Sequence, residues 1–200
     1  MMIAIMDYGV GNLYSITCAL TKLGAEVKLI EAVKDGLNAG ALILPGVGNF
    51  SAVAERLNKE KEAIYDYIKG GRPLLGICLG LHILLEGSEE GEGSGLSIFP
   101  GSARRLPTGV KIPHIGWNTL KIVKQHEFVE GVQDGSWVYF VHSYYPSLAD
   151  REPMLAETHY GLTFPSILGK GALIGTQFHP EKSAETGKTL LKNFLKMIKR

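Results

Sequence analysis

The sequence predicts an α/β protein with a doubly wound, mostly parallel central sheet, flanking helices and an added antiparallel strand region. In the first half of the chain, apolar runs of strand length alternate with amphipathic helical patterns. This alternation is typical of a parallel sheet that helices cover on both faces. From about residue 114 onward, strand-like runs follow one another with only turns between them, which predicts the antiparallel region.

The elements of the first half can be assigned in order. Strands are expected in the apolar runs at residues 2–9, 25–31, 41–48 and 71–77. Helices are expected at residues 13–23, 51–57 and 63–69, where apolar residues recur at helical spacing. Gly24 follows the first of these helices at the position that favours a C-capping glycine.

Strands dominate the second half, which begins after a glycine-rich acidic loop at residues 86–95. They are expected at residues 114–123, 137–145, 154–160 and 165–178, with a hairpin at residues 169–171. A last helix is expected to begin near Ser183, whose hydroxyl suits an N-cap. Its buried face would carry Leu191, Phe194, Leu195 and Ile198.

Composition limits the class of protein. The chain has 200 residues, 45% of them hydrophobic, and we expect one domain over residues 1–200. Lys and Arg (21) balance Asp and Glu (20), so nothing favours nucleic acid, and no apolar run is long enough for a membrane. Cys18 and Cys78 do not form a disulfide framework, which predicts a reduced, cytoplasmic protein with Cys18 in helix packing.

Cys78 lies at a predicted corner between a strand and a helix. In the stretch "GICLG", residues 76–80, a glycine stands two positions to either side of it. Gly-x-Cys-x-Gly is the cysteine version of the nucleophile elbow, in which the central residue occupies a strained turn. The free N–H groups that begin the helix would favour its thiolate. A buried, inert cysteine is the alternative, and the corner alone does not decide between them.

A cysteine nucleophile needs a histidine and a third group that holds the imidazole. His179, in "TQFHPEKS", is the best candidate, because Pro180 favours an extended backbone in which Glu181 would share its face. The alternative is a surface turn that caps the last helix. His114 and His142, both in predicted strands, remain candidates for the base, although neither has a carboxylate two residues later.

The developing oxyanion of such a reaction needs hydrogen-bond donors. Leu79 offers a backbone N–H at the start of the helix that follows Cys78. A second donor is expected in "LPGVGNF", residues 44–50, where glycines flank Val47 and allow unusual dihedral angles. By itself, this stretch is equally typical of an ordinary turn.

Three motifs in the order "LPGVG", "GICLG" and "FHPEKS" resemble the class I glutamine amidotransferases, and the resemblance covers nearly the whole chain. Within that class, four further stretches are similar to the glutaminase subunits of imidazole glycerol phosphate synthases. These stretches are "DYGVGNLYSI", "PGVGNF", "PHIGWN" and "YFVHSYY".

This resemblance implies a role for each matching residue. Cys78 would be the nucleophile, His179 the general base and acid, and Glu181 its orienting partner. The implied oxyanion hole comprises Gly46, Val47 and Leu79, the glutamine site His82, His142, Ser143 and Tyr144, and the partner interface Trp117, Tyr139 and Lys182.

The implied activity is hydrolysis of glutamine to glutamate and ammonia, with no cofactor and no metal ion. The resemblance further implies a heterodimer with a separate cyclase subunit, a (βα)8 barrel. That partner would use the ammonia to make imidazole glycerol phosphate and aminoimidazole carboxamide ribonucleotide in histidine biosynthesis.

One position departs from the family. Its elbow usually continues Leu-Gly-Met-Gln, whereas this chain has Leu81 and His82, which affects how glutamine would be held. Three other readings remain open: a glutaminase subunit of another synthase, a catalytically silent assembly subunit, and a cysteine peptidase or γ-glutamyl hydrolase.

Overall fold

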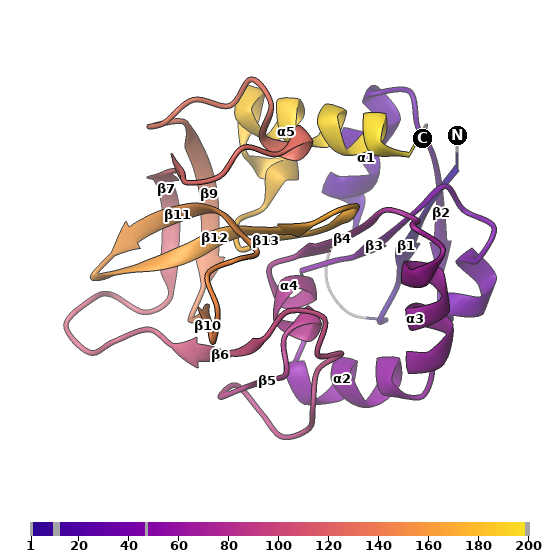
Figure 1. Cartoon of the computed structure of the whole chain (residues 1–200), viewed down its shortest axis with the longest axis horizontal. Coiled ribbons are helices and arrows are strands. Elements are labelled where there is room, and N and C mark those ends of the chain that lie inside the picture. The colour runs from indigo at the N-terminus through magenta and orange to yellow at the C-terminus, as the bar shows by residue number, and fades with distance from the viewer. Residues whose placement is uncertain (1, 10–12, 47, 199–200) are drawn as a thin grey trace.

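An eight-stranded sheet forms the centre of the computed structural model, which describes residues 2–9, 13–46 and 48–198 (Figure 1). The strand order is β2-β1-β3-β4-β13-β12-β11-β8; the first five strands pair in parallel and the last three antiparallel. The strands are β1 (Met2–Met6), β2 (Glu26–Ile30), β3 (Ala41–Leu44), β4 (Leu74–Ile77), β8 (Lys121–Ile122), β11 (Met154–Tyr160), β12 (Leu162–Lys170) and β13 (Leu173–Thr176). The predicted fold class is confirmed.

Helices cover both faces of the sheet. The helices α1 (Tyr14–Lys22) and α5 (Ala184–Met197) lie on one face, and α2 (Phe50–Asn58), α3 (Lys61–Lys69) and α4 (Leu79–Leu84) lie on the other (Figure 1). Successive side chains of β1 point to opposite faces of the sheet. Ile3 and Ile5 pack in the core under α1 and α5. Ala4 and Met6 pack in the core under α2, α3 and α4. All four side chains are fully buried.

Two smaller sheets extend the molecule beyond the central sheet. One has the order β10-β6-β5, and the other pairs β7 with β9 antiparallel. The predicted strands at 114–123 and 137–145 were therefore too long, because each breaks where the chain passes into another sheet. The remaining elements are β5 (Gly87–Ser88), β6 (Gly101–Arg105), β7 (His114–Thr119), β9 (Trp137–His142), β10 (Tyr144–Leu148) and the 3-10 turns η1 (Val33–Gly36), η2 (Glu127–Val129) and η3 (Pro180–Lys182).

The start of α5 differs from the expected N-cap. Ser183 precedes the helix, but its hydroxyl makes no capping bond to the helix backbone. Instead, Ser183 Oγ donates to the carbonyl of His179 at 2.6 Å and accepts the N–H of Tyr139 at 3.0 Å. The hydroxyl therefore ties strand β9 to the turn η3.

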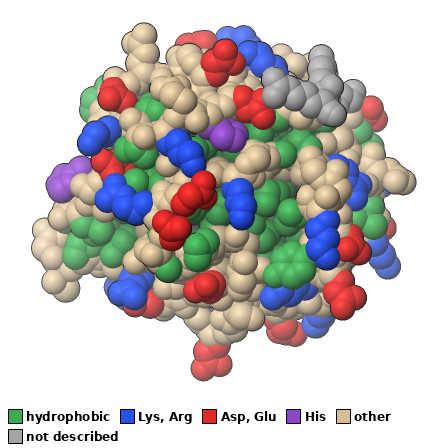
Figure 2. Space-filling model, in the orientation of Figure 1, with side chains coloured by type: hydrophobic (Ala, Val, Ile, Leu, Met, Phe, Trp, Pro, Cys, Tyr) green, Lys and Arg blue, Asp and Glu red, His purple; other side chains and the backbone are tan. Residues whose placement is uncertain are grey.

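The surface of the molecule mixes charges of both signs. On the face shown in Figure 2, Lys and Arg side chains lie among Asp and Glu side chains without forming a patch of one sign. No helix in the described part of the chain has the length and apolar character needed to span a membrane.

Close backbone contact fixes α4 against the sheet. A Cβ atom on Gly80 would lie 2.0 Å from the carbonyl oxygen of Leu44 in β3, and one on Gly76 would lie 2.7 Å from the backbone of Gly80. Both obstacles are backbone atoms in regular elements, so neither can move aside cheaply. These two glycines set the distance between α4 and the sheet.

We expect Gly80→Ala to lower the free energy of unfolding by about 3 kcal/mol or more, because the added methyl overpacks rigid backbone. Gly87→Ala is the control, since its nearest obstacle is 3.9 Å away. Urea denaturation measures both variants. Equal stability for the two would contradict this account of the α4 contact.

Candidate active site

Cys78 stands at the corner between β4 and α4 in a strained conformation. Its backbone angles are φ 49° and ψ −101°, in a region that residues with a Cβ rarely adopt. The strain persists because Cys78 N–H donates to Thr176 O at 2.7 Å and because Gly76 and Gly80 allow the close approach of α4. The side chain is buried beside the first N–H groups of α4, as a nucleophile elbow requires.

His179 and Glu181 form a buried hydrogen-bonded pair near Cys78. The distance from His179 Nδ1 to Glu181 Oε1 is 2.8 Å, and both side chains are more than nine-tenths buried. The expected pairing is present, but its predicted geometry is wrong: Glu181 lies in the 3-10 turn η3, not in an extended segment. The tight turn, rather than strand alternation, brings the carboxylate to the ring.

The environment of His179 favours its charged form. Burial alone lowers its pKa, but hydrogen bonds to Cys78 and Glu181, together with the charge of those groups, outweigh burial and raise the pKa to about 10. The ring is therefore protonated at neutral pH. Since the proton on Nδ1 bonds Glu181, the other ring nitrogen is left to interact with the sulfur of Cys78.

Gly46 lies against both Cys78 and His179. A Cβ atom here would come within 2.8 Å of Cys78 Cβ and 3.0 Å of His179 Cε1. The loop after β3 therefore reaches the site, where its peptide groups could hold an oxyanion together with the N–H of Leu79. Val47, the other predicted member of the oxyanion hole, lies outside the described residues.

A cavity of about 310 Å³ opens beside Cys78, within the usual size range of small-ligand sites. All the residues that the sequence assigned to the glutamine site line it. The lining comprises Gly46, Gly48, Cys78, Leu79, His82, Glu90, Pro113, Val141, His142, Ser143 and Tyr144. Sequence reasoning missed Glu90, because several acidic residues stand in the same loop and nothing distinguishes this one. In the structure, burial raises the pKa of the Glu90 carboxyl.

Gln177 is a second residue that sequence reasoning missed. It is fully buried, and its side-chain amide donates to Cys78 Sγ at 3.6 Å. Its carbonyl oxygen lies 2.8 Å from Nε2 of His82. The signal that could have found it is the spacing of two residues from His179, which places both side chains near the same strand end.

His114 and His142, the alternative bases, are held neutral. His142 Nδ1 donates to the carbonyl of Tyr144 at 2.8 Å, so its Nε2 accepts the bond from His114 Nδ1 at 3.0 Å. Burial lowers the pKa of His114 to about 4 and that of His142 to about 3. Since neither bonds a carboxylate, the geometry favours His179 as the base.

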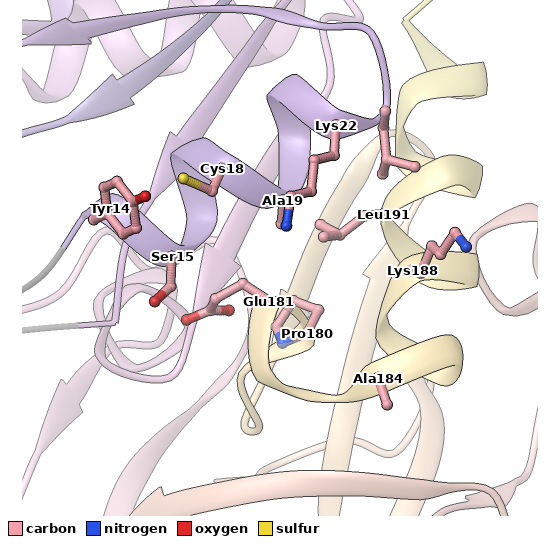
Figure 3. Close-up of a pocket in the computed structure, with 11 residues that line it drawn as sticks. Tyr14, Ser15, Cys18, Ala19, Lys22, Pro180, Glu181, Ala184, Lys188 and Leu191 are labelled. Atoms are coloured by element: carbon pink, nitrogen blue, oxygen red, sulfur yellow. The ribbon is translucent and has the colours of Figure 1, made fainter.

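A second hollow, of about 540 Å³, is lined by Glu181 and Pro180 (Figure 3). Helices α1 and α5 form its walls, with Cys18 and Lys22 on the first and Lys188 on the second. Cys18, which the sequence assigned to packing, is thus half-buried along this hollow. Cys78 does not line this hollow.

Two of the predicted interface residues, Trp117 and Tyr139, lie on the pair β7–β9, and the third, Lys182, lies in the turn η3. Trp117 and Tyr139 are opposite one another in the register, with ring centroids 5.9 Å apart. The Lys182 ammonium lies 6.0 Å from the centre of the Tyr139 ring. The three residues therefore form one cluster close to His179, whose N–H donates to the carbonyl of Tyr139 at 3.0 Å.

The geometry described so far can perform acyl transfer: a buried thiol, a charged imidazole, a carboxylate and a cavity converge at one edge of the sheet. Within the described ranges, no cluster of three or more His, Cys, Asp or Glu side chains is arranged to hold a metal ion. The family described as Glutamine amidotransferase class-I matches residues 4–198. The chain belongs to the class I glutamine amidotransferases.

Within this family, the chain is similar to proteins named imidazole glycerol phosphate synthase subunit HisH. It is 47% identical to that of Caldanaerobacter subterraneus subsp. tengcongensis over 99% of both chains, and 45% identical to that of Archaeoglobus fulgidus over 100% of both. Solved structures that share the fold include a glutamine amidotransferase (TM-score 0.77, 19% identity, 99% of both chains). Another is PurLQS from Thermotoga maritima (TM-score 0.77, 17% identity, 98% of this chain and 97% of that one).

The charged state of His179 predicts the reactivity of Cys78. In a Cys18→Ala background, where Cys78 is the remaining thiol, alkylation by iodoacetamide should be fast at pH 7, where the His179 ring with its raised pKa of about 10 is charged. With His179→Asn, the rate at neutral pH should fall at least tenfold and rise toward alkaline pH, as for an ordinary thiol with a pKa of about 8.5. Identical pH profiles would rule out the ion pair.

Proposed function

We propose that this chain hydrolyses glutamine to glutamate and ammonia and delivers the ammonia to a separate cyclase subunit of imidazole glycerol phosphate synthase. The observation that carries the proposal is the arrangement of Cys78, His179 and Glu181 beside a ligand-sized cavity. The relatives named as HisH subunits support the assignment to histidine biosynthesis. Both cysteines are free, in keeping with a single domain that works in the reducing cytoplasm.

The chemistry follows from the protonation of the site. The Cys78 thiolate attacks the side-chain amide carbon of glutamine, and the N–H of Leu79 with a peptide of the loop after Gly46 stabilises the oxyanion. The His179 imidazolium gives its proton to the leaving nitrogen, so ammonia departs and a thioester remains. Neutral His179 then takes a proton from water, whose oxygen attacks the thioester and releases glutamate. Glu181 stabilises the imidazolium at each stage.

Recognition of glutamine requires groups for its charged α-ammonium and α-carboxylate. Among the described lining residues, Glu90 is the one carboxylate, and we assign it to the α-ammonium. Ser143 and Tyr144 line the same cavity where β9 passes into β10, and their peptide and hydroxyl groups suit the α-carboxylate. His142 lines this side of the cavity with its neutral ring fixed by Tyr144.

We expect Cys78→Ala in the complex with the cyclase to abolish glutamine-dependent synthesis while an added ammonium salt still supports it, because the cyclase would not need the lost step. Cys18→Ala is the matched control and should keep both activities, since its thiol lies outside the cavity. The measurement is product formation with each nitrogen source. Near wild-type glutamine turnover by Cys78→Ala would contradict the proposed nucleophile.

We assign the cyclase to one surface of the pair β7–β9. Register and alternation place Ile115, Trp117, Trp137, Tyr139 and Val141 on this surface, which we call the β7–β9 face. Ile115, Trp117 and Trp137 are 58%, 49% and 57% exposed, which is unusual for adjacent large apolar side chains. Exposed tryptophans beside a lysine are typical anchors of a protein interface.

We expect Trp117→Ala to weaken cyclase binding by about 2 kcal/mol, or roughly thirtyfold in Kd, because truncation removes a large anchor from the β7–β9 face. Leu29→Ala is the control, since Leu29 is also exposed (47%) but lies on β2, at the opposite end of the molecule (Figure 1). Isothermal titration calorimetry with the cyclase gives both constants. An unchanged Kd for Trp117→Ala would remove this residue from the interface.

A further inference from the structure

A chain of two hydrogen bonds leads from His82 through Gln177 to Cys78. The Nε2 atom of His82 lies 2.8 Å from Gln177 Oε1, and Gln177 Nε2 lies 3.6 Å from Cys78 Sγ. His82 is 3% exposed and Gln177 is fully buried. The three residues come from α4, from the segment after β13 and from the corner after β4, and His82 and Cys78 both line the cavity.

The direction of each bond is set by its acceptor. A carbonyl oxygen accepts, so His82 carries its proton on Nε2 and donates to Gln177. Burial lowers the pKa of His82 to about 4, which keeps the ring neutral at neutral pH. The bond to Gln177 then fixes the tautomer of the neutral ring. The backbone N–H of Gln177 donates to Ser166 O at 2.9 Å, so the main chain of Gln177 is anchored independently of its side chain.

The orientation of the Gln177 amide decides whether its NH₂ group or its oxygen faces the sulfur of Cys78. With Oε1 held by His82, the NH₂ group faces Cys78 and donates to it. A flipped amide would instead direct oxygen lone pairs at a thiolate. The sulfur also lies 3.7 Å from Val141 O, an acceptor that favours the protonated thiol. The donor from Gln177 therefore offsets the effect of the Val141 carbonyl and adds to that of the charged His179 ring.

We propose that His82 is a positioning residue: it fixes the amide of Gln177 so that this amide stabilises the Cys78 thiolate, and its Nε2 does not bind glutamine. The proposal rests on the proposed glutaminase function for its kinetic consequences, although its effect on the sulfur does not depend on that function. Because Nε2 is already bonded to Gln177, this nitrogen of the ring is not available to bind substrate.

The test is a double-mutant cycle in a Cys18→Ala background, with His82→Leu, Gln177→Leu and the double variant, each in complex with the cyclase. Two quantities are measured: the rate of Cys78 alkylation by iodoacetamide at pH 7, and kcat and KM for glutamine. We expect each single variant to lower alkylation and kcat by roughly ten- to a hundredfold with little change in KM. The double variant should be no slower than the slower single one, because His82 acts only through Gln177.

Two conservative variants show whether the hydrogen bonds themselves matter. His82→Gln can still donate to Gln177 and should restore most of the alkylation rate. Gln177→Glu keeps the shape of the side chain but places a carboxylate beside the sulfur, and it should slow alkylation at pH 7 even if the leucine variants do not fold. His159→Leu is the control, since His159 lies exposed on β11 and its side chain bonds only Thr163 among the contacts described.

Several outcomes would overturn the proposal. Additive effects in the double variant, or a change in KM alone with normal alkylation, would mean that His82 contacts glutamine directly. Unchanged alkylation in Gln177→Glu would exclude the amide as a donor to the sulfur. If the parent complex instead alkylates rapidly but does not hydrolyse glutamine, the proposed function fails while the alkylation cycle still decides this inference.

Discussion

The parallel pairing of β4 with β13 is the constraint on which the site depends. Its register places Thr176 opposite Ile77, and Cys78 N–H bonds Thr176 O directly beyond that pair. Because parallel strands end at the same edge, the corner with Cys78 and the segment that leads to His179 leave the sheet side by side. A shift of one residue would turn every side chain of β13 to the opposite face, and the site would not form.

Histidine side chains in this site differ in charge: one is protonated and two are neutral. His179, His114 and His142 are all buried, and burial by itself lowers the pKa of each. Only His179 meets a carboxylate and the sulfur of Cys78, whose combined effect exceeds the cost of burial. Cys78 and Glu181 together thus determine that His179 is the charged histidine, and the short turn η3 places Glu181 next to the ring.

Local patterns in the sequence were enough to predict most elements, the elbow at Cys78 and the pairing of His179 with Glu181. The contacts of Gln177 were beyond their reach, because its two partners lie 95 and 99 positions away and meet it only once β13 lies next to β4. The motif places His82 in the glutamine site, and it lines the cavity, but the motif does not indicate its bond to Gln177. That bond depends on how the short helix α4 packs against the sheet, which the pattern of six residues does not specify.

Tyr139 takes part in two different kinds of interaction. Its backbone N–H and C=O bond Ser183 and His179, whereas its ring belongs to the exposed β7–β9 face. The segment with His179 is therefore held by backbone atoms of Tyr139, which every amino acid except proline would also supply. The side chain at this position, which lies on the surface, is free to vary. A chain organised in this way can exchange one partner for another during evolution by changing side chains on that face, while the position of His179 is inherited unchanged.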